Sequence, residues 1–278
     1  MRKLTHERIH ARYYKDGYGR GEGSDYRPWL AAGDVPSGGV TTQFPGRKTG
    51  RAHVAFSHLE RGAMLAALWL DNVTDLREQF PLWPLSETMA IADKLGVTHP
   101  SHPDGTPVVM TTDVLLTVNN AEPQLQPITV KPETELNNSR VLEKLEIERL
   151  YWDDRGMKLG IVTGAELPAP LIKNLDWIDE YYEISQETLQ PEEIPGLIDY
   201  LFSEISTNAA TDPLRTICGA ADDRLGHRPG TSLAVVRHAL SRKFWRVPLD
   251  HEINPRQPFP APTRAASQNA RGRLLVGG

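Results

Sequence analysis

A single hairpin pattern in the middle of the chain constrains the fold more than any other feature. Residues 108–118 (VVMTTDVLLTV) and 125–131 (LQPITVK) are rich in β-branched side chains, which favours strands. The Asn-Asn-Ala-Glu-Pro segment between them has turn-forming residue types, and Pro132 ends the second run. Folding the chain about Asn120 and Ala121 therefore predicts two antiparallel strands in the core of a sheet.

Further elements are predicted on both sides of this hairpin. Ser57 and Glu60 have the spacing of a capping box, and apolar residues follow them at helical spacing. The sequence also predicts a strand in residues 72–80, helices in 86–95 and 139–155, and a buried strand in 157–163. This order of elements indicates an α/β core with a mixed sheet flanked by helices.

The pattern changes after Gly164, where helices dominate. They are predicted at residues 167–184, 190–205 and 214–225, followed by a fourth helix capped by Thr231 and a short strand at 244–249. Helices followed by a β-ribbon are typical of a small winged-helix-like domain. The 278 residues suggest two domains of ordinary size. We expect an N-terminal arm (1–50), an α/β domain (51–166), a helical domain (167–253) and a tail (254–278).

Both ends of the chain are predicted to be flexible. The first 50 residues are rich in glycine, and residues 17–23 lack the spacing of a nucleotide-binding loop. The tail is rich in proline, alanine, glycine and arginine, which is typical of a mobile segment. Aromatic side chains lie among the arginines of the arm, in a combination suited to a nucleic-acid backbone: Tyr13, Tyr14, Tyr18 and Trp29.

The charge of the chain is unevenly distributed. The formal net charge is -5, but residues 176–212 contain ten acidic residues and no lysine or arginine. Without that segment the rest of the chain carries +5, and the first 50 residues carry +4. Two interpretations of the acidic segment remain open. It is either a solvated face, or it faces a protein partner while the basic parts contact phosphates.

Composition excludes several classes of protein. The one cysteine, Cys218, excludes an internal disulfide and a zinc site with several cysteines. The longest apolar stretch, residues 62–70, is too short to cross a membrane, and the N-terminus has no hydrophobic signal core. His99 and His102 lie in a proline-rich segment, which favours a loop over a zinc-binding pair. We therefore expect a cytoplasmic protein without a membrane partner.

The hairpin brings together residues suited to phosphodiester hydrolysis. Asp113 falls opposite Thr129, and Thr129 and Lys131 share a face because alternate side chains of a strand do so. A carboxylate binds Mg²⁺ through oxygen, and the cation activates water. A lysine stabilises the charge that develops on the phosphate. This arrangement is typical of a magnesium-dependent nuclease, but the same spacing also predicts a plain cross-strand ion pair.

Two glutamates on helices are further candidates. Glu60 lies at the start of the first helix, where its capping-box role is a sufficient explanation on its own. Glu148 interrupts the apolar face formed by Val141, Leu145 and Trp152, and an inward carboxylate requires a partner or a metal. The alternative is a helix tilt that leaves Glu148 at the solvent boundary.

At these residues the sequence resembles the TnsA family, the endonuclease subunits of heteromeric bacterial transposases. The resemblance runs from about residue 12 to about 180 and continues more thinly through 231–250. It rests on several motifs in order: KDGYGRGEGSDYRPWL (15–30), SHLE (57–60), DLREQFPL (75–82), THP (98–100), MTTD (110–113), VKP (130–132) and LEKLEIERLYW (142–152).

The resemblance implies a restriction-endonuclease-like catalytic domain and a winged-helix-like C-terminal domain. It implies Mg²⁺-dependent cleavage of the 5′ strand at double-stranded transposon ends, with Mn²⁺ as a substitute. The expected partners are a TnsB-like transposase and a TnsC-like ATPase, and the protein is expected at the nucleoid when active. The implied roles are Glu60 and Asp113 as metal ligands, Lys131 as the catalytic lysine, the Val130 carbonyl as a further ligand, and Glu148 as a supporting acid.

One position departs from the family pattern. Thr129 stands where the family usually has glutamine, and its hydroxyl is a shorter, neutral and poorer metal ligand. A second hypothesis is therefore a catalytically weak subunit that bridges DNA, transposase and ATPase. A third is a nuclease that acts without partners. In each case a basic cluster near the end of the last helix is a candidate for phosphate contacts, or an ordinary basic surface: Arg237, His238, Arg242, Lys243 and Arg246.

Overall fold

The computed structural model of the chain describes residues 6–32, 41–186 and 188–265. The chain divides into two compact units, Met1–Pro168 (unit 1) and Ala169–Gly278 (unit 2). Each unit has its own buried apolar side chains, including Trp152 in unit 1 and Trp245 in unit 2. Among the described residues, no helix is long and apolar enough to cross a membrane.

Unit 1 is built on a four-stranded sheet in the order β3-β4-β5-β6. The strands are β3 (Val73–Pro81), β4 (Thr111–Asn119), β5 (Pro123–Val130) and β6 (Gly160–Val162). The first three are antiparallel neighbours, and β6 runs parallel to β5. The predicted hairpin is therefore confirmed as the centre of a mixed sheet.

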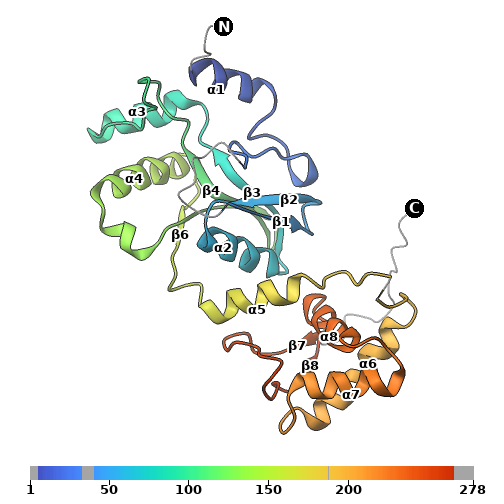
Figure 1. The fold of residues 1–278 in the computed structure, drawn as a ribbon. Coiled ribbons are helices and arrows are strands. Elements are labelled where there is room, and N and C mark those ends of the chain that lie inside the picture. Colours follow the sequence, from blue (N-terminus) through green and yellow to red (C-terminus); the bar gives the residue numbers. More distant parts are fainter. Residues whose placement is uncertain (1–5, 33–40, 187, 266–278) are drawn as a thin grey trace. The chain divides into compact units, whose positions relative to one another are not determined.

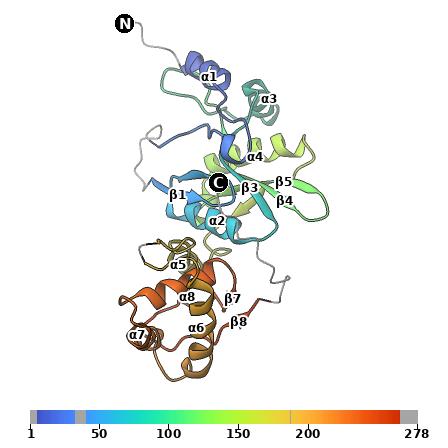
Figure 2. The same cartoon turned by 90° about the vertical axis from the view of Figure 1, so that its right-hand side faces the viewer.

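Helices cover both faces of this sheet (Figures 1 and 2). On one side lies α2 (His58–Trp69), and on the other lie α3 (Leu85–Leu95) and α4 (Ser139–Asp153). Short 3-10 helices occupy Gly23–Asp25 (η1) and Glu133–Asn137 (η2). The cluster between the sheet and the α3–α4 layer contains Leu82, Ile91, Ala92, Met110, Leu115, Ile147, Tyr151 and Trp152. The α/β prediction is thus confirmed for this part of the chain.

A second, two-stranded sheet precedes α2 and was not predicted from the sequence. It pairs β1 (Thr42–Gly46) with β2 (Arg51–Ala55). The buried Glu78 of β3 binds this hairpin, because Arg51 donates two hydrogen bonds of 2.7 and 2.6 Å to its carboxylate. His53 contacts the same carboxylate at 2.8 Å, so the hairpin is fixed to β3 through the buried Glu78 carboxylate.

The prediction of a flexible N-terminal arm is wrong for the residues that the structure describes. A helix, α1, spans His6–Lys15, and the following segment packs along β3. Tyr26 and Trp29 are 3% and 2% exposed, and the Trp29 amide donates to the Gln79 carbonyl. Gly19 lies so close to Pro81 that a Cβ there would be 2.1 Å from the proline ring. Burial of the aromatic residues explains why this segment is ordered.

Unit 2 is mostly helical. It contains α5 (Ala169–Asp179), α6 (Ile194–Asn208), α7 (Leu214–Leu225) and α8 (Thr231–Ser241), followed by a ribbon of β7 (Trp245–Arg246) and β8 (Thr263–Arg264). Helix α8 packs against the other three and is the most buried of them. Unit 2 thus consists of four helices and a short ribbon, and its predicted winged-helix character stays a prediction.

Several predicted details are corrected. Strand β6 is short and not buried, since Ile161 is 47% exposed at the edge of the sheet. Thr231 does not cap α8. Asp222 of α7 does so instead, accepting hydrogen bonds from the amides of Gly230 and Ser232 at 2.7 and 2.8 Å. The strand predicted at 244–249 is reduced to β7.

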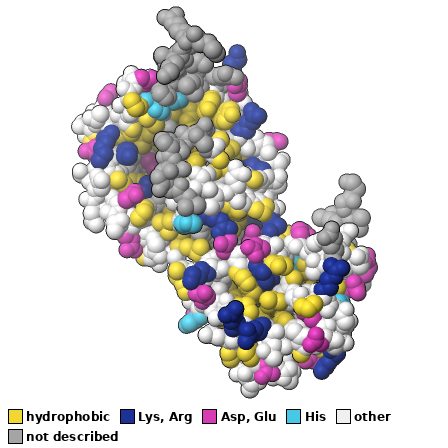
Figure 3. Space-filling model, in the orientation of Figure 1, with side chains coloured by type: hydrophobic (Ala, Val, Ile, Leu, Met, Phe, Trp, Pro, Cys, Tyr) yellow, Lys and Arg dark blue, Asp and Glu magenta, His cyan; other side chains and the backbone are white. Residues whose placement is uncertain are grey.

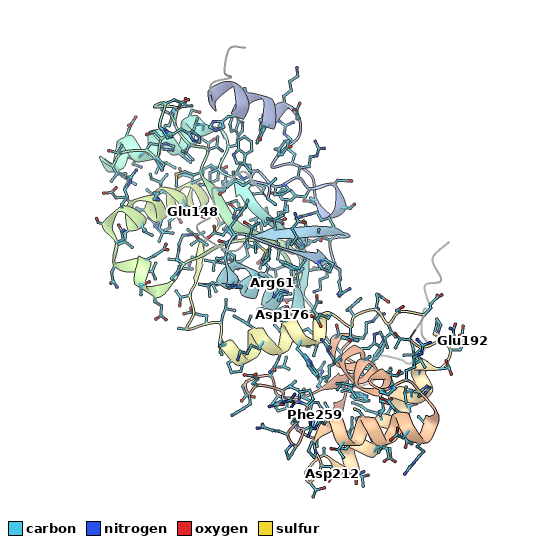
Figure 4. The ribbon with its side chains drawn as sticks, in the orientation of Figure 1. Arg61, Glu148, Asp176, Glu192, Asp212 and Phe259 are labelled. Atoms are coloured by element: carbon cyan, nitrogen blue, oxygen red, sulfur yellow. The ribbon has the colours of Figure 1, made fainter. Side chains whose placement is uncertain are left out.

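The tail is not mobile in its first half. Phe259 is 4% exposed and packs within unit 2 (Figure 4). The amides of Leu214 and Arg215 donate to the carbonyls of Gln257 and Pro255, which fixes this segment at the start of α7. The remainder of the predicted tail, residues 266–278, lies outside the described residues.

Candidate active site

Asp113 lies where the hairpin register predicts it. Val114 pairs with Ile128, so Asp113 stands opposite Thr129. Its Oδ2 accepts three hydrogen bonds, from the Thr129 hydroxyl at 3.0 Å, the Val130 amide at 2.7 Å and the Lys131 ammonium at 2.8 Å. Because the hydroxyl and the amide belong to a buried part of β5, the carboxylate is held in one orientation.

The Lys131 ammonium bridges two oxygens. Besides Asp113 it donates to the carbonyl of Val130 at 3.1 Å. Burial acts to lower the pKa of Lys131, but Asp113, then Glu148 and Glu60, act in the opposite direction, and the pKa lies above its usual value. Lys131 is therefore charged at neutral pH. The cross-strand ion pair that the sequence allowed is present, and it lies within the predicted set of nuclease residues.

Glu60 forms the predicted capping box. Its amide donates to the Ser57 hydroxyl at 3.1 Å, and its carboxylate accepts from the Phe56 amide at 3.0 Å. The same carboxylate also interacts electrostatically with the charged residues at the end of the hairpin. Burial, followed by the charge of Asp113, raises the pKa of Glu60, and Lys131 opposes this shift. The cap therefore places Glu60 within electrostatic range of Asp113, in addition to its role in starting the helix.

Glu148 faces inward from α4, so the alternative of a solvent-boundary position is wrong. It is 5% exposed, and its Oε1 is buried without a hydrogen-bond partner among the described residues. Figure 4 labels Glu148 where α4 meets the sheet. Burial, followed by the charge of Asp113, raises its pKa to about 8, although a Thr112 hydrogen bond and Lys131 lower it. A buried carboxylate with one unpartnered oxygen and a raised pKa favours a proton or a cation.

These residues fit a hard cation by the chemistry of their donors. Glu60, Asp113 and Glu148 supply carboxylates and Val130 supplies a carbonyl, the oxygen ligands that Mg²⁺ prefers. The described residues contain no finished cluster of three or more such side chains at metal-binding distance. However, Asp113 raises the pKa of both glutamates. That shift and the unpartnered Glu148 oxygen indicate an excess of negative charge that a cation would neutralise.

Thr129 supports Asp113 directly. Its side chain is 1% exposed and donates to the carboxylate that the family pattern assigns to the metal. The hydroxyl thus acts on the orientation of Asp113, whatever its weakness as a ligand.

The basic residues predicted to contact DNA are not equivalent. Arg237 is 9% exposed, lies 3.8 Å from the Tyr181 ring centroid and donates to the Trp177 carbonyl, so the structure argues against it as a phosphate contact. His238 is also buried and contacts the Tyr181 carbonyl.

The remaining three basic residues follow α8. Arg242 is exposed but pairs with Glu183 at 3.2 Å. Lys243 is half-buried, and Arg246 is exposed on β7. Arg246 is therefore the exposed member of the predicted cluster for which no ion pair is found among the described residues.

Two buried polar residues of β3 close to this site were not predicted as site residues from the sequence. Glu78 and Gln79 are buried in β3 at 0% and 4% exposure. They lie in the DLREQFPL string (75–82), which belongs to the family resemblance and overlaps the strand predicted at 72–80. Five of the nine residues of β3 are polar, so the sequence does not single out Glu78 and Gln79; their burial is seen only in the fold.

Two family models match the chain in succession. Residues 70–164 match the N-terminal domain of TnsA-like endonucleases, and residues 166–249 match the C-terminal domain of TnsA endonuclease. A curated relative, the transposon Tn7 transposition protein TnsA of Escherichia coli, is 34% identical over 234 residues, which are 84% of this chain and 83% of that protein. The chain belongs to the TnsA family. The resemblance seen in its motifs is thereby confirmed.

The TnsA match divides the candidate residues between its two domains. Asp113, Lys131 and Glu148 fall within the match to the TnsA-like N-terminal domain, and Arg246 falls within the match to the C-terminal one. Both models describe parts of an endonuclease, so the match alone does not assign the candidate site to one unit. Glu60 precedes the first match, and its assignment depends on the geometry described above.

Proposed function

We propose that this chain hydrolyses a phosphodiester bond at the 5′ side of each end of its transposon, in an Mg²⁺-dependent reaction. The observation that carries the proposal is the Asp113–Lys131 contact at 2.8 Å, beside two carboxyl groups whose pKa values are raised. A charged ammonium next to a set of metal-binding oxygens is what phosphodiester hydrolysis requires.

Each residue has a separate task in this proposal. Lys131 carries positive charge beside the position where the phosphate becomes more negative, and Asp113 fixes its ammonium. Glu60, Asp113, Glu148 and the Val130 carbonyl would hold the cation. Mg²⁺, or Mn²⁺ in its place, supplies polarisation of the phosphodiester and activation of a water molecule. Thr129 keeps the Asp113 carboxylate oriented toward this set.

Unit 2 is proposed to act as a winged-helix-like module that contacts transposon-end DNA. Its exposed Arg246 lies on the ribbon after α8, and Arg242 lies at the end of that helix. The related Tn7 protein belongs to a transposition system, and on that basis we propose a TnsB-like transposase and a TnsC-like ATPase as partners.

Strand-specific mapping of cuts tests the proposal. The full chain is incubated with a duplex that carries a transposon end, with Mg²⁺ and with both partner proteins. We expect 5′-side cuts from the unchanged chain, and Asp113→Ala or Lys131→Ala should reduce them by at least about 100-fold. Glu146→Ala is the matched control, because Glu146 lies on α4 but is exposed and pairs with Arg149.

The same experiment distinguishes the competing functions. A subunit that only bridges DNA and partners would give the same product distribution with and without the Asp113 change. A nuclease that acts alone would cut without the partner proteins. Cutting that survives both Asp113→Ala and Lys131→Ala would show that the active site lies elsewhere.

A further inference from the structure

The side-chain alternation of β3 reverses at one point. Glu78 contacts Arg51 and His53 of the β1–β2 hairpin, whereas Phe80, two residues later, packs against Trp152 of α4. In a regular strand these two side chains would lie on the same face. Residues on either side of Gln79 therefore point to opposite layers of unit 1.

Strand β4 reverses at the matching position. Trp152 donates to the Thr112 hydroxyl at 2.7 Å, and Leu115 packs in the same cluster around Trp152. Residues three apart share a face only if the alternation changes between them. The register pairs Glu78 with Val114 and Phe80 with Thr112, so Gln79 stands opposite Asp113. Both reversals coincide at this pair.

Gln79 has the backbone conformation that produces the reversal. Its φ is +48°, and among the described residues of unit 1 it is the one residue other than glycine with a positive φ. This left-handed region is unfavourable for a side chain with a Cβ, and glycine would adopt it more easily. A glutamine at this position requires a side-chain contact that offsets the strain.

Such contacts are present on both sides of Gln79. Its Oε1 accepts a hydrogen bond from the Thr111 hydroxyl at 3.0 Å, and its carbonyl accepts one from the Trp29 amide at 3.2 Å. The side chain is 4% exposed. Thr111 is two residues before Asp113 in β4. The Gln79 side-chain amide therefore restrains the end of β4 that carries the Asp113 carboxylate.

We propose that Gln79 is a positioning residue for Asp113. Its left-handed backbone produces the reversal of side-chain alternation that β3 and β4 share at the candidate active site. Its side-chain amide holds Thr111 through a hydrogen bond. Together these contacts set the direction in which Asp113 meets the cation. The inference rests on the proposed function, and it assigns to Gln79 an effect on cation affinity rather than contact with DNA.

The test measures binding of Mn²⁺ alone to the full chain by titration calorimetry. Gln79→Gly keeps the left-handed backbone and removes the amide. We expect it to weaken Mn²⁺ binding about 10-fold, as loss of a residue that orients a metal ligand does. Gln79→Asn, which tolerates this backbone and retains an amide, should recover part of the affinity. Gln124→Gly, on an exposed part of β5, is the matched control and should bind like the unchanged chain.

Thermal unfolding of each variant separates positioning from loss of fold. The inference requires weaker binding by Gln79→Gly at a Tm close to that of the unchanged chain. It is overturned if Gln79→Gly binds Mn²⁺ normally while Asp113→Ala does not, since the metal site would then exist without help from Gln79. If the unchanged chain binds no Mn²⁺, the metal-dependent function itself fails, and this inference fails with it.

Discussion

Glu148 is a buried residue whose charge depends on what the candidate active site contains. Its carboxyl is buried, one oxygen has no hydrogen-bond partner among the described residues, and its pKa is about 8. Below pH 4.5 the group is neutral in both the folded and the unfolded chain. As the pH rises from 4.5 to 8, the unfolded carboxyl loses its proton while the folded one keeps it. The free energy of unfolding therefore falls as the pH rises through this range. Above pH 8 the loss is on the order of a few kcal/mol.

We accordingly expect Glu148→Gln to flatten the pH dependence of stability in the metal-free protein. From pH 5 to pH 9 the Tm of the unchanged chain should fall further than the Tm of the variant, because glutamine does not ionise. Thermal unfolding in a chelating buffer measures both profiles. Saturating Mg²⁺ should raise the Tm of the unchanged chain at pH 8 and have little effect on Glu148→Gln. Parallel profiles for the two proteins would contradict the pKa assigned to Glu148.

Single residues were predictable from the sequence to different degrees. The hairpin register placed Asp113, Thr129 and Lys131 together, because strand pairing follows from turn position and alternation. The same alternation rule could not find Gln79, since it assumes regular strands and Gln79 is where the strand reverses. The inward Glu148 was visible as a break in an apolar helix face, but its proximity to Asp113 required the fold.

At the scale of elements, the β1–β2 hairpin is fixed by a buried ionic cluster. Glu78 contacts Arg51 and His53, and His53 also contacts the Thr49 hydroxyl at 2.9 Å. Burial acts to raise the pKa of Glu78, but Arg51 and His53 outweigh it and hold the pKa at about 2. Because β2 leads directly into the capping box at Ser57, the cluster also determines where α2 begins.

Arg51→Ala should destabilise unit 1 by about 3–5 kcal/mol, because it leaves the Glu78 carboxylate buried without its main partner. The favourable contribution of a lowered carboxyl pKa is present above pH 4.5 and is lost as the pH falls toward 2. The variant should therefore also unfold at a higher pH during acid denaturation. Hydrogen exchange followed by peptide localises the effect, and faster exchange is expected in β1, β2 and β3.

Arg149→Ala is the comparison for this change. Arg149 forms ion pairs with Glu146 and Asp153 on the exposed side of α4, and pairs of this kind contribute about 0–1 kcal/mol. Equal destabilisation by the two variants would show that the hairpin is not held by Glu78. The β1–β2 hairpin was not predicted from the sequence because Pro45 and Gly46 interrupt the strand pattern of β1. The residue that holds it, Glu78, is also 27 positions away from Arg51.

Across the whole molecule, the acidic segment is compensated by nearby basic residues of unit 2. Glu180 pairs with Arg237, Glu183 with Arg242 and Asp199 with Arg264. On the face shown in Figure 3, lysine and arginine side chains lie next to aspartate and glutamate side chains. Counting charges along the sequence separated an acidic segment from basic ends, whereas folding brings the two signs together. Part of the predicted basic surface is thus used within unit 2.

This compensation leads to a prediction about DNA binding by the full chain. Arg246 is exposed on β7, and no ion pair involving it is found among the described residues, whereas Arg237 is buried against Trp177 and Tyr181. Arg246→Ala should weaken binding to a fluorescent duplex, reduce the slope of log affinity against log salt by about 1, and leave the Tm unchanged. Arg237→Ala should instead lower the Tm of unit 2, because it removes the partner of buried carbonyl and aromatic groups.

Fluorescence anisotropy at several salt concentrations, combined with calorimetric unfolding, separates the two effects. Lys173→Ala is the matched control, since Lys173 is an exposed cation of unit 2 that pairs with Glu252 at 2.8 Å. An unchanged salt slope for Arg246→Ala would remove the ribbon from the DNA interface. Weaker binding by Arg237→Ala at an unchanged Tm would mean that this arginine leaves its aromatic contacts to reach DNA. Because the chain carries a net charge of -5, we expect the affinity for duplex alone to be modest, which favours delivery of the nuclease to transposon ends by its partners.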